Sequence, residues 1–158
     1  MPDMLVKLYT LPDLEPVLAQ QRAAGVEIRR ALPPEKHVVV AWVRREFGDI
    51  WASETDVSFS HRPVGCFIAA EGQQMLGFAC YETTCKNFFG PTGVSEAARG
   101  RGIGAALLLA TLHAMRWEGY AYAIIGAVGP AEFYTRVVGA VLIDDSTPSI
   151  LGGLLRAE

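Results

Sequence analysis

The spacing of hydrophobic and polar residues in the first third of the chain switches between the period of a strand and that of a helix. Residues 26–32 alternate apolar with charged side chains, as a half-buried strand does. In residues 35–47, Val39, Val43 and Phe47 recur at helical spacing beside charged positions, which predicts an amphipathic helix. The elements expected here are a strand at 5–8, a helix at 14–24, a strand at 26–32 and a helix at 35–47.

From Val64 onward the pattern changes to short runs rich in Val, Phe, Ile and Tyr, which favour strands. The tripeptide Glu71-Gly72-Gln73 indicates a hairpin turn between the first two runs. A long apolar helix ends at Glu118, and Gly129-Pro130 opens a further helix. The expected elements are strands at 65–70, 75–82 and 88–94, a helix ending at 118, a strand at 122–128, a helix through 138 and a strand at 140–143.

This order of elements is an antiparallel meander that leads into a β-loop-α-β unit, so we expect an α+β or α/β fold. A length of 158 residues suits one domain with one sizeable core. We find no internal repeat, low-complexity tract or polar linker. We therefore treat residues 1–158 as a single domain.

Composition and charge narrow the function classes. Hydrophobic residues make up 51% and charged residues 20%, which is typical of a globular protein. The formal net charge of −3 argues against a surface that binds nucleic acid. No apolar run approaches the ~18 residues that a membrane span requires, so we expect no membrane association.

The expected compartment is the cytoplasm. The N-terminal residues lack the basic region and cleavage site of a signal peptide. The three cysteines, Cys66, Cys80 and Cys85, form no C-x-x-C pair and are odd in number. Reduced thiols that act as small apolar residues explain them better than a disulfide framework does.

The candidate chemistry lies in the run Arg99-Gly100-Arg101-Gly102-Ile103-Gly104, between an expected strand and an expected helix. Its glycines permit close approach of a ligand to the backbone, and the first N–H groups of a helix have no internal partner. The helix dipole and the two arginines add positive charge at that point. A pyrophosphate is the ligand that such a turn favours.

Two familiar phosphate loops fit this run poorly. A Walker loop needs Lys and Ser or Thr after its last glycine, and neither follows Gly104. The dinucleotide pattern G-x-G-x-x-G/A is matched literally by Gly100, Gly102 and Ala105. That pattern requires an acidic residue after the next strand and more parallel strands than the remaining chain can provide.

A third type fits best, because residues 94–108 closely resemble the acetyl-CoA loop of the GCN5-related N-acetyltransferase (GNAT) superfamily, Q/R-x-x-G-x-G/A. Arg99, Gly102 and Gly104 stand at its fixed positions. The resemblance implies that the loop amides hold the CoA pyrophosphate, that the preceding strand pairs with the pantetheine arm, and that acetyl-CoA is the co-substrate. The implied cofactor-binding residues are Gly93, Val94, Arg99, Gly100, Arg101, Gly102, Ile103, Gly104 and Ala105.

A second segment, residues 132–140, is similar to the family's later helix, which carries a Tyr near the thiol of the cofactor; here that residue is Tyr134. The chain departs from the family pattern at two points. Ala127 stands where an Asn usually precedes the Tyr by seven residues. The usual ending is Tyr, three residues and then Gly-Phe, whereas Gly139 follows Tyr134 by five residues and precedes Ala140. These departures keep open the alternative of a noncatalytic acyl-CoA-binding or regulatory module.

The resemblance covers residues 64–143 and implies a GNAT-like mixed, mostly antiparallel central sheet flanked by helices. Residues 64–143 would form the cofactor-binding core and residues 1–63 the substrate side. The implied activity is transfer of an acetyl group from acetyl-CoA to a primary amine of a small molecule or protein, by direct attack in a ternary complex.

Such a reaction needs a proton acceptor for the amine and a proton for the departing thiolate. Glu82, at the end of an expected strand, is the first candidate for the base, and Tyr134 is the candidate for the acid. The stretch before residue 64 suggests an acidic and aromatic substrate pocket. Its candidate residues are Trp51, Glu54 and His61, with Asp56 and Phe59 beside them.

A cysteine nucleophile is a weaker hypothesis, because Cys80 and Cys85 have no nearby histidine in the sequence to act as a paired base. We expect no metal site. The amine acceptor and the oligomeric state stay open, a homodimer being compatible with the sequence.

Overall fold

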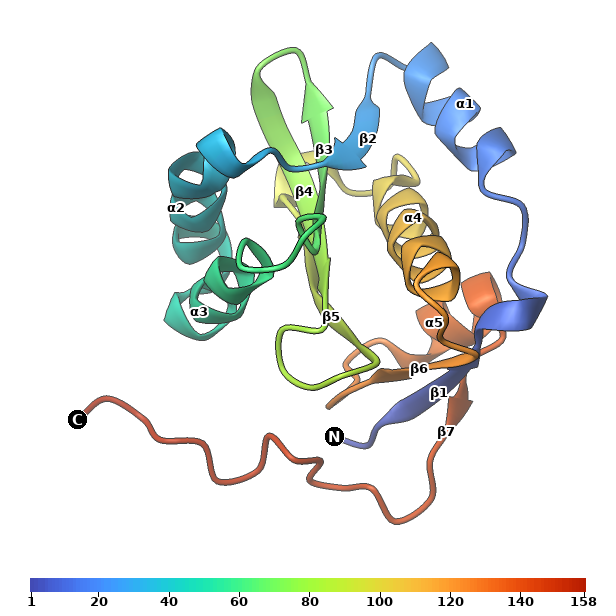
Figure 1. Ribbon diagram of the computed structural model, residues 1–158, viewed down its shortest axis with the longest axis vertical. Helices are drawn as coiled ribbons and strands as arrows, with labels where there is room; N and C mark the ends of the chain where they lie inside the picture. The colour runs from blue at the N-terminus through green and yellow to red at the C-terminus, as the bar shows by residue number, and fades with distance from the viewer.

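The computed structural model describes residues 1–158 as one sheet with helices on both of its faces (Figure 1). The strands are β1 (Met4–Lys7), β2 (Glu27–Arg30), β3 (Cys66–Glu71), β4 (Gln74–Tyr81), β5 (Phe88–Val94), β6 (Tyr122–Ile125) and β7 (Val141–Leu142). The helices are α1 (Glu15–Ala23), α2 (Lys36–Phe47), α3 (Asp49–Ser58), α4 (Ile103–Trp117) and α5 (Ala131–Val138). Short 3-10 helices lie at Leu8–Thr10, Pro33–Glu35 and Glu96–Ala98.

The seven strands are ordered β2-β3-β4-β5-β6-β1-β7. Every neighbouring pair is antiparallel except β5 and β6, which run parallel and are connected through α4. A parallel pair needs such a crossover, whereas the antiparallel β3 and β4 need only the Gly72 turn. The expected fold class, a mixed and mostly antiparallel GNAT-like sheet flanked by helices, is confirmed.

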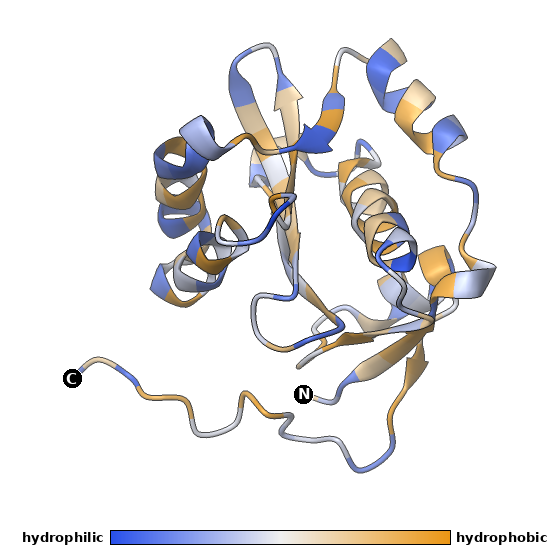
Figure 2. Cartoon of the chain, in the orientation of Figure 1, coloured by the Kyte–Doolittle hydropathy of each residue, from blue (hydrophilic) through white to orange (hydrophobic).

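Helix α4 packs at the centre of one face of the sheet, and Figure 2 shows it hydrophobic along almost all of its length. Eleven of its fifteen residues are buried. Its two buried polar side chains are satisfied, since the Thr111 hydroxyl donates to the Leu107 carbonyl and a His113 ring nitrogen lies 2.8 Å from the Pro12 carbonyl oxygen. No helix is long and apolar enough to cross a membrane.

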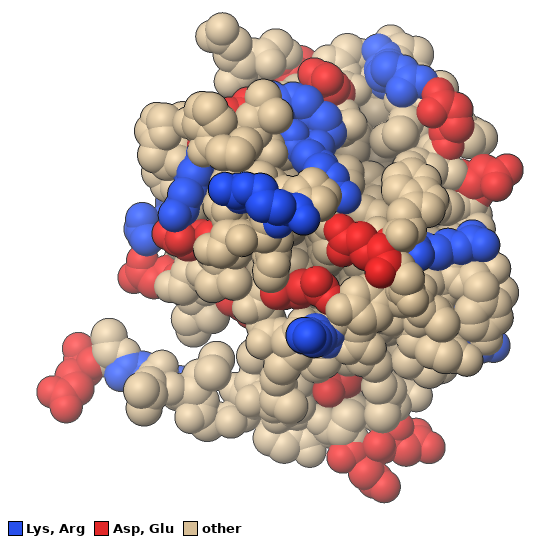
Figure 3. Space-filling view, in the orientation of Figure 1, with Lys and Arg blue, Asp and Glu red and all other residues tan.

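Helices α2 and α3 cover the opposite face of the sheet with a second, smaller core. Val39 and Val43 are buried there, as the helical spacing predicts. The Phe47 ring lies beside the Trp51 ring, at 5.1 Å between centroids, and both pack against Phe78 of β4. Acidic and basic side chains are interspersed over the face shown in Figure 3.

The sheet is divided near its centre, where β5 and β6 part. They pair only at Phe88 with Ile124 and Phe89 with Ile125. Beyond Phe89, β5 continues to Val94 beside β4 alone. The edge of β5 that faces β6 therefore carries backbone groups without a partner strand.

The sequence-based boundaries differ from the observed ones in two places that matter for the site. Residues 49–58, expected only as a polar stretch, form α3, which buries Ala52, Thr55 and Ser58 at its inner side. The strand expected at 122–128 ends at Ile125, and Gly126 to Pro130 form a loop at the open end of the sheet.

Gly93 on β5 provides a test of how this face is packed. A Cβ atom there would lie 2.5 Å from Cζ of Phe47, whose ring is held by Trp51 and Phe78 and cannot move freely. We expect Gly93→Ala to lower the free energy of unfolding by about 1–3 kcal/mol, measured by urea denaturation. Gly129→Ala is the control, since a Cβ atom there meets nothing within 4 Å. Equal stability of the two variants would contradict this packing.

Candidate active site

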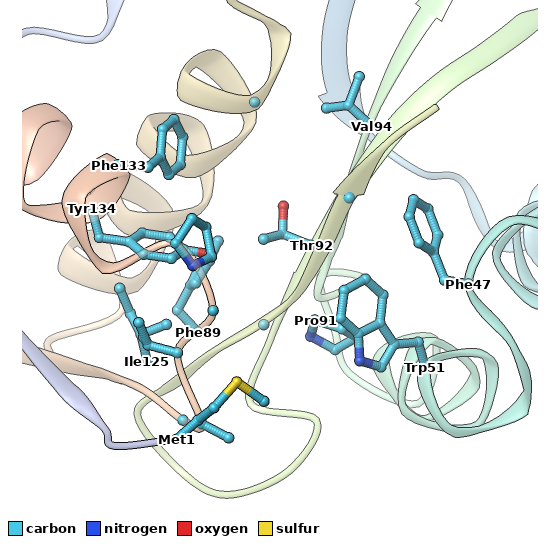
Figure 4. Close-up of a pocket in the computed structure, with 18 of the residues that line it drawn as sticks. Met1, Phe47, Trp51, Phe89, Pro91, Thr92, Val94, Ile125, Phe133 and Tyr134 are labelled. Carbon is cyan, nitrogen blue, oxygen red and sulfur yellow. The ribbon is translucent and has the colours of Figure 1, made fainter. Parts of the chain in front are cut away.

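A cleft of about 1080 Å³ occupies the gap between β5 and β6 (Figure 4). Its walls come from the glycine loop and the start of α4, from β5, from the loop after β6, and from α3 and α5. Residues 148, 151 and 152 of the C-terminal segment also line it. The parting of two strands thus brings six separate parts of the sequence to one cavity, as ligand sites in such sheets often require.

The glycine loop forms one end of this cleft. Six successive backbone N–H groups, those of residues 100–105, donate to no backbone carbonyl. Gly100 and Gly102 have φ angles of 80° and 78°, a region that side chains disfavour. The loop is held from behind by Gln21, whose amide donates to the Arg101 carbonyl at 2.9 Å. This cradle of free donors at a helix N-terminus has the chemistry that a pyrophosphate requires.

Two arginines contribute to the cleft, and only one of them was expected. Arg99 lines it, with its Nε donating to the Val94 carbonyl at 3.3 Å. Arg136 of α5 also lines it. Arg101 does not, because its side chain turns away to pair with Glu71 at 2.7 Å. The other expected loop residues, Gly93, Val94, Gly100, Gly102, Ile103, Gly104 and Ala105, all line the cleft.

Tyr134 lies on the other wall, in α5, and points into the cleft in Figure 4. Its ring packs edge-on against Phe89 and Phe133. Burial raises the pKa of the Tyr134 phenol to about 12, with no charged neighbour contributing to the shift. The phenol therefore carries its proton at any pH near neutrality.

The additional residue between Tyr134 and Gly139 is accommodated after the tyrosine. Helix α5 ends at Gly139, which is left-handed with a φ of 65°. The N–H of Gly139 donates to the Thr135 carbonyl, and that of Ala140 donates to the Tyr134 carbonyl. The departure from the family spacing is thus contained in the helix C-terminus.

The second departure, Ala127, lies in the loop after β6. Ala127 has a φ of 47°, and its N–H donates to the Asp3 carboxylate at 2.8 Å. Asp3 is largely buried beside β1. A carboxylate from the first strand thus fixes this loop, and the cleft wall at Ala127 carries no side-chain amide.

Glu54 and Trp51, both expected on the substrate side, line the cleft from α3. The Glu54 carboxylate accepts a hydrogen bond from the Thr84 hydroxyl. Burial raises the pKa of the Glu54 carboxyl above its usual range, and the bond from Thr84 partly offsets that shift. A carboxylate in this position accepts protons more readily than an exposed one.

Glu82 and His61 do not line the cleft. The Glu82 carboxylate accepts hydrogen bonds from the Tyr120 hydroxyl and the Asn87 N–H, and a His61 ring nitrogen lies 3.1 Å from the Glu82 carbonyl oxygen. Asp56 pairs with Lys36 at 3.0 Å. Glu82 was expected at the end of a strand, but β4 ends one residue before it. With a φ of 58°, Glu82 has left the strand conformation that was expected to direct its side chain toward the site.

The cysteines also lie elsewhere. Cys66 and Cys80 face each other across β3 and β4 and are fully buried, and all three thiols are free. The Cys80 thiol donates to the Thr55 hydroxyl at 3.8 Å. None of the three lines the cleft, so a cysteine nucleophile has no support there.

Sequence reasoning missed several residues that line the cleft. Phe47 was assigned to the apolar face of a helix. The sequence around Arg136 gave no indication of a site residue, apart from its place two residues after Tyr134. Thr84 lies in the irregular connection before β5, where no periodicity indicates direction. The missed residues include Met1, Phe47, Thr84, Phe88, Phe133, Arg136, Pro148 and Leu151.

Comparison with known proteins agrees with this geometry. Residues 62–137 match the model of the acetyltransferase (GNAT) domain. No curated protein matches the chain significantly in sequence. The matched residues run from the start of the meander through Tyr134, and so include the whole glycine loop.

Solved structures share the fold at low sequence identity. A GCN5-related glucosamine N-acetyltransferase region of a fungal multi-domain GH3 β-N-acetylglucosaminidase has a TM-score of 0.73 and 16% identity, over 90% of this chain and 19% of that one. A GCN5-related N-acetyltransferase from Sphaerobacter thermophilus has a TM-score of 0.64 and 20% identity, over 90% of this chain and 48% of that one. A GNAT family N-acetyltransferase from Escherichia coli, in complex with CoA, has a TM-score of 0.54 and 23% identity, over 71% of this chain and 67% of that one.

Residues 62–137 therefore match the GNAT acetyltransferase domain, and the chain has the fold of the GCN5-related N-acetyltransferases. It spans about a fifth of the fungal protein and about half of the Sphaerobacter one. The resemblance identified from the glycine loop is confirmed.

Proposed function

We propose that this protein transfers the acetyl group of acetyl-CoA to a primary amine. The observation that carries the proposal is the joining, in one cleft, of five residues with free N–H donors, a half-buried carboxylate and a protonated phenol. The GNAT fold supports acyl-CoA-dependent acetyl transfer in general. The acceptor and the roles of individual residues are our inference.

The residues present fit acetyl-CoA. The N–H groups of residues 100–105 offer donors to the pyrophosphate oxygens, and Arg99 and Arg136 add positive charge. The free edge of β5 beyond Phe89 offers backbone donors and acceptors to the amide groups of the pantetheine arm. Bound there, acetyl-CoA supplies the acetyl group and leaves as free thiol.

Glu54 is our choice for the proton acceptor. An amine with a pKa near 10 arrives at pH 7 mostly as an ammonium, about 99.9% protonated, and cannot attack until a base takes its proton. Glu54 is the one carboxylate that lines the cleft. The Glu82 carboxylate accepts a hydrogen bond from Tyr120 and does not line the cleft, which supports the choice of Glu54.

Tyr134 is our choice for the group that faces the departing sulfur. Its hydroxyl keeps its proton because burial raises its pKa to about 12. It can donate a hydrogen bond, and then the proton, to the thiolate as that charge develops. In the proposed sequence Glu54 first takes a proton from the ammonium and releases it to solvent. The neutral amine then attacks, so that a C–N bond forms and the C–S bond breaks, while the second amine proton passes to Glu54 and the phenol proton passes to sulfur. Transfer of the Glu54 proton to the Tyr134 phenolate through solvent restores both groups.

The runner-up is a noncatalytic module that binds acyl-CoA. The absence of a side-chain amide at Ala127 favours it, since one polar group found in the usual family pattern is missing from the wall opposite β5. Turnover separates the two proposals, because a binding module holds acetyl-CoA without releasing thiol when amines are added.

The cofactor can be tested by thermal unfolding. Acetyl-CoA at ~100 times its Kd should stabilise the fold by about 2.7 kcal/mol, which raises Tm by roughly 5–10 °C for a domain of this size. Gly104→Val should remove this shift, because its branched side chain would occupy the cradle, where a Cβ atom already lies 3.8 Å from Phe133.

Ala41→Val, at an exposed position of α2, is the control for the added methyl groups and should keep the shift. NAD, which also carries a pyrophosphate, should give no comparable shift. A larger response to NAD than to acetyl-CoA would overturn the acyl-CoA proposal in favour of a dinucleotide.

The base can be tested through the pH dependence of turnover. Glu54→Gln should lower kcat at pH 7 by roughly 10²-fold or more, and the deficit should narrow toward pH 10, where the amine arrives neutral. The exposed Glu46→Gln, on α2 and away from the cleft, should behave as the native protein does. A deficit in Glu82→Gln with none in Glu54→Gln would return the role to Glu82.

The acid can be tested by removing one oxygen atom. Tyr134→Phe keeps the ring contacts with Phe89 and Phe133 but deletes the hydroxyl, so kcat should fall by roughly 10²-fold while the Kd of acetyl-CoA changes little. Tyr122→Phe, at an exposed tyrosine of β6, is the matched control. An unchanged kcat in Tyr134→Phe would exclude the phenol from the chemistry.

A further inference from the structure

The positively charged and the negatively charged side chains of the cleft lie in different parts of it. Of its 32 lining residues, three carry a charged side chain: Glu54, Arg99 and Arg136. Arg99 belongs to the glycine loop. The Arg136 guanidinium lies over the Phe133 ring, at 6.0 Å, and that ring borders Gly104 at the start of α4. Both cations are therefore at the phosphate end, and Glu54 stands across β5 on α3.

The wall beside Glu54 is aromatic. Trp51 precedes Glu54 by one helical turn on α3, and the Phe47 ring lies against it. Figure 4 shows both rings on the far side of β5 from Tyr134. Phe47 reaches this place because Gly93 has no side chain. An ammonium group near Glu54 would thus have a flat apolar surface next to it.

Apolar residues from both chain ends line the lower end of the cleft. Met1 enters it from below in Figure 4, and Pro148 and Leu151 line it from the C-terminal segment. No arginine, lysine or histidine lines the cleft on the Glu54 side. An anionic group beside the amine of the acceptor would meet no cationic side chain there and would be repelled by Glu54.

We propose that the acceptor is a small primary amine whose body is apolar and of aromatic size, and which bears no carboxylate or phosphate near the amine. This inference rests on the proposed acetyltransferase function and narrows it. The ammonium pairs with Glu54, and the apolar body packs on Trp51. Trp51 acts in specificity and Glu54 acts in both specificity and proton transfer.

The test compares three amines of one shape by release of CoA thiol at saturating acetyl-CoA. Phenethylamine has the apolar body alone, L-phenylalanine adds a carboxylate, and L-phenylalaninamide adds a neutral group of similar size. After correction for the fraction of neutral amine, kcat/KM for phenethylamine should exceed that for L-phenylalanine at least tenfold. L-phenylalaninamide should fall between them, because it adds bulk without charge.

Two variants separate the contributions. Trp51→Ala should raise the KM of phenethylamine at least fivefold and leave the KM of acetyl-CoA within twofold, whereas Trp117→Ala, 71% exposed on α4, should change neither. If the Trp51→Ala variant does not fold, Trp51→Leu replaces it, because leucine keeps apolar bulk against Phe47. Glu54→Gln should reduce the preference for phenethylamine over L-phenylalanine, a ratio that loss of the base alone would not alter.

The outcomes are distinguishable. Equal or better use of L-phenylalanine overturns the proposed acceptor class, as does an unchanged KM for phenethylamine in both Trp51 variants. Preference for glucosamine or spermidine over phenethylamine also overturns the class but leaves acetyl transfer standing. If no amine of the panel releases thiol although acetyl-CoA raises Tm, both the acceptor class and the enzyme proposal fall, and the binding module replaces them.

Discussion

The site depends on one constraint, which is that β5 and β6 pair for only two residues and then separate. While two parallel strands stay paired, no ligand can enter between them, because each satisfies the backbone groups of the other. Once they part, β5 offers a free edge, α4 begins at the opening with its first N–H groups unpaired, and the loop after β6 forms the facing wall. The large apolar α4 makes this parting tolerable, since it buries the sheet behind the cleft and holds both strands in place.

The same opening explains which parts of the site were predictable. The glycine loop is a local feature, in which Gly100 and Gly102 adopt left-handed angles that few other residues accept, so its sequence identifies it directly. The carboxylates were not predictable in this way. Glu82 was expected at a strand end and Glu54 in a polar stretch. Glu82 falls beyond the last pair of β4 and accepts a hydrogen bond from Tyr120, whereas α3 brings Glu54 to the cleft. Helix α3 was missed because its polar side faces outward and its buried residues are small.

Packing of α2 against the sheet also connects the proposed substrate side of the cleft with the proposed cofactor side. Phe47 is the last residue of α2, and its ring occupies the space that a side chain at Gly93 would need. Gly93 lies on β5, the strand that leads into the phosphate loop. The position of the aromatic wall is therefore set by β5 as well as by the helices that carry it. Sequence periodicity assigned Phe47 to the inner face of α2 correctly, but it carries no information about the glycine that lies opposite.

The two departures from the family pattern bear on different parts of the mechanism. The residue added after Tyr134 is taken up between the tyrosine and Gly139, and the phenol still faces the cleft from the first half of α5. The replacement of the usual Asn by Ala127 removes a side-chain amide from the wall, and the Asp3 carboxylate fixes the loop there through a backbone bond. A wall held in this way supplies position but no side-chain amide toward the cleft, so the mechanism that we propose relies on Glu54 and Tyr134 for proton transfer. Burial raises the pKa of the Tyr134 phenol to about 12 and also raises the pKa of the Glu54 carboxyl. The proposed mechanism therefore combines a phenol that holds its proton with a carboxylate that accepts a proton more readily than an exposed one does.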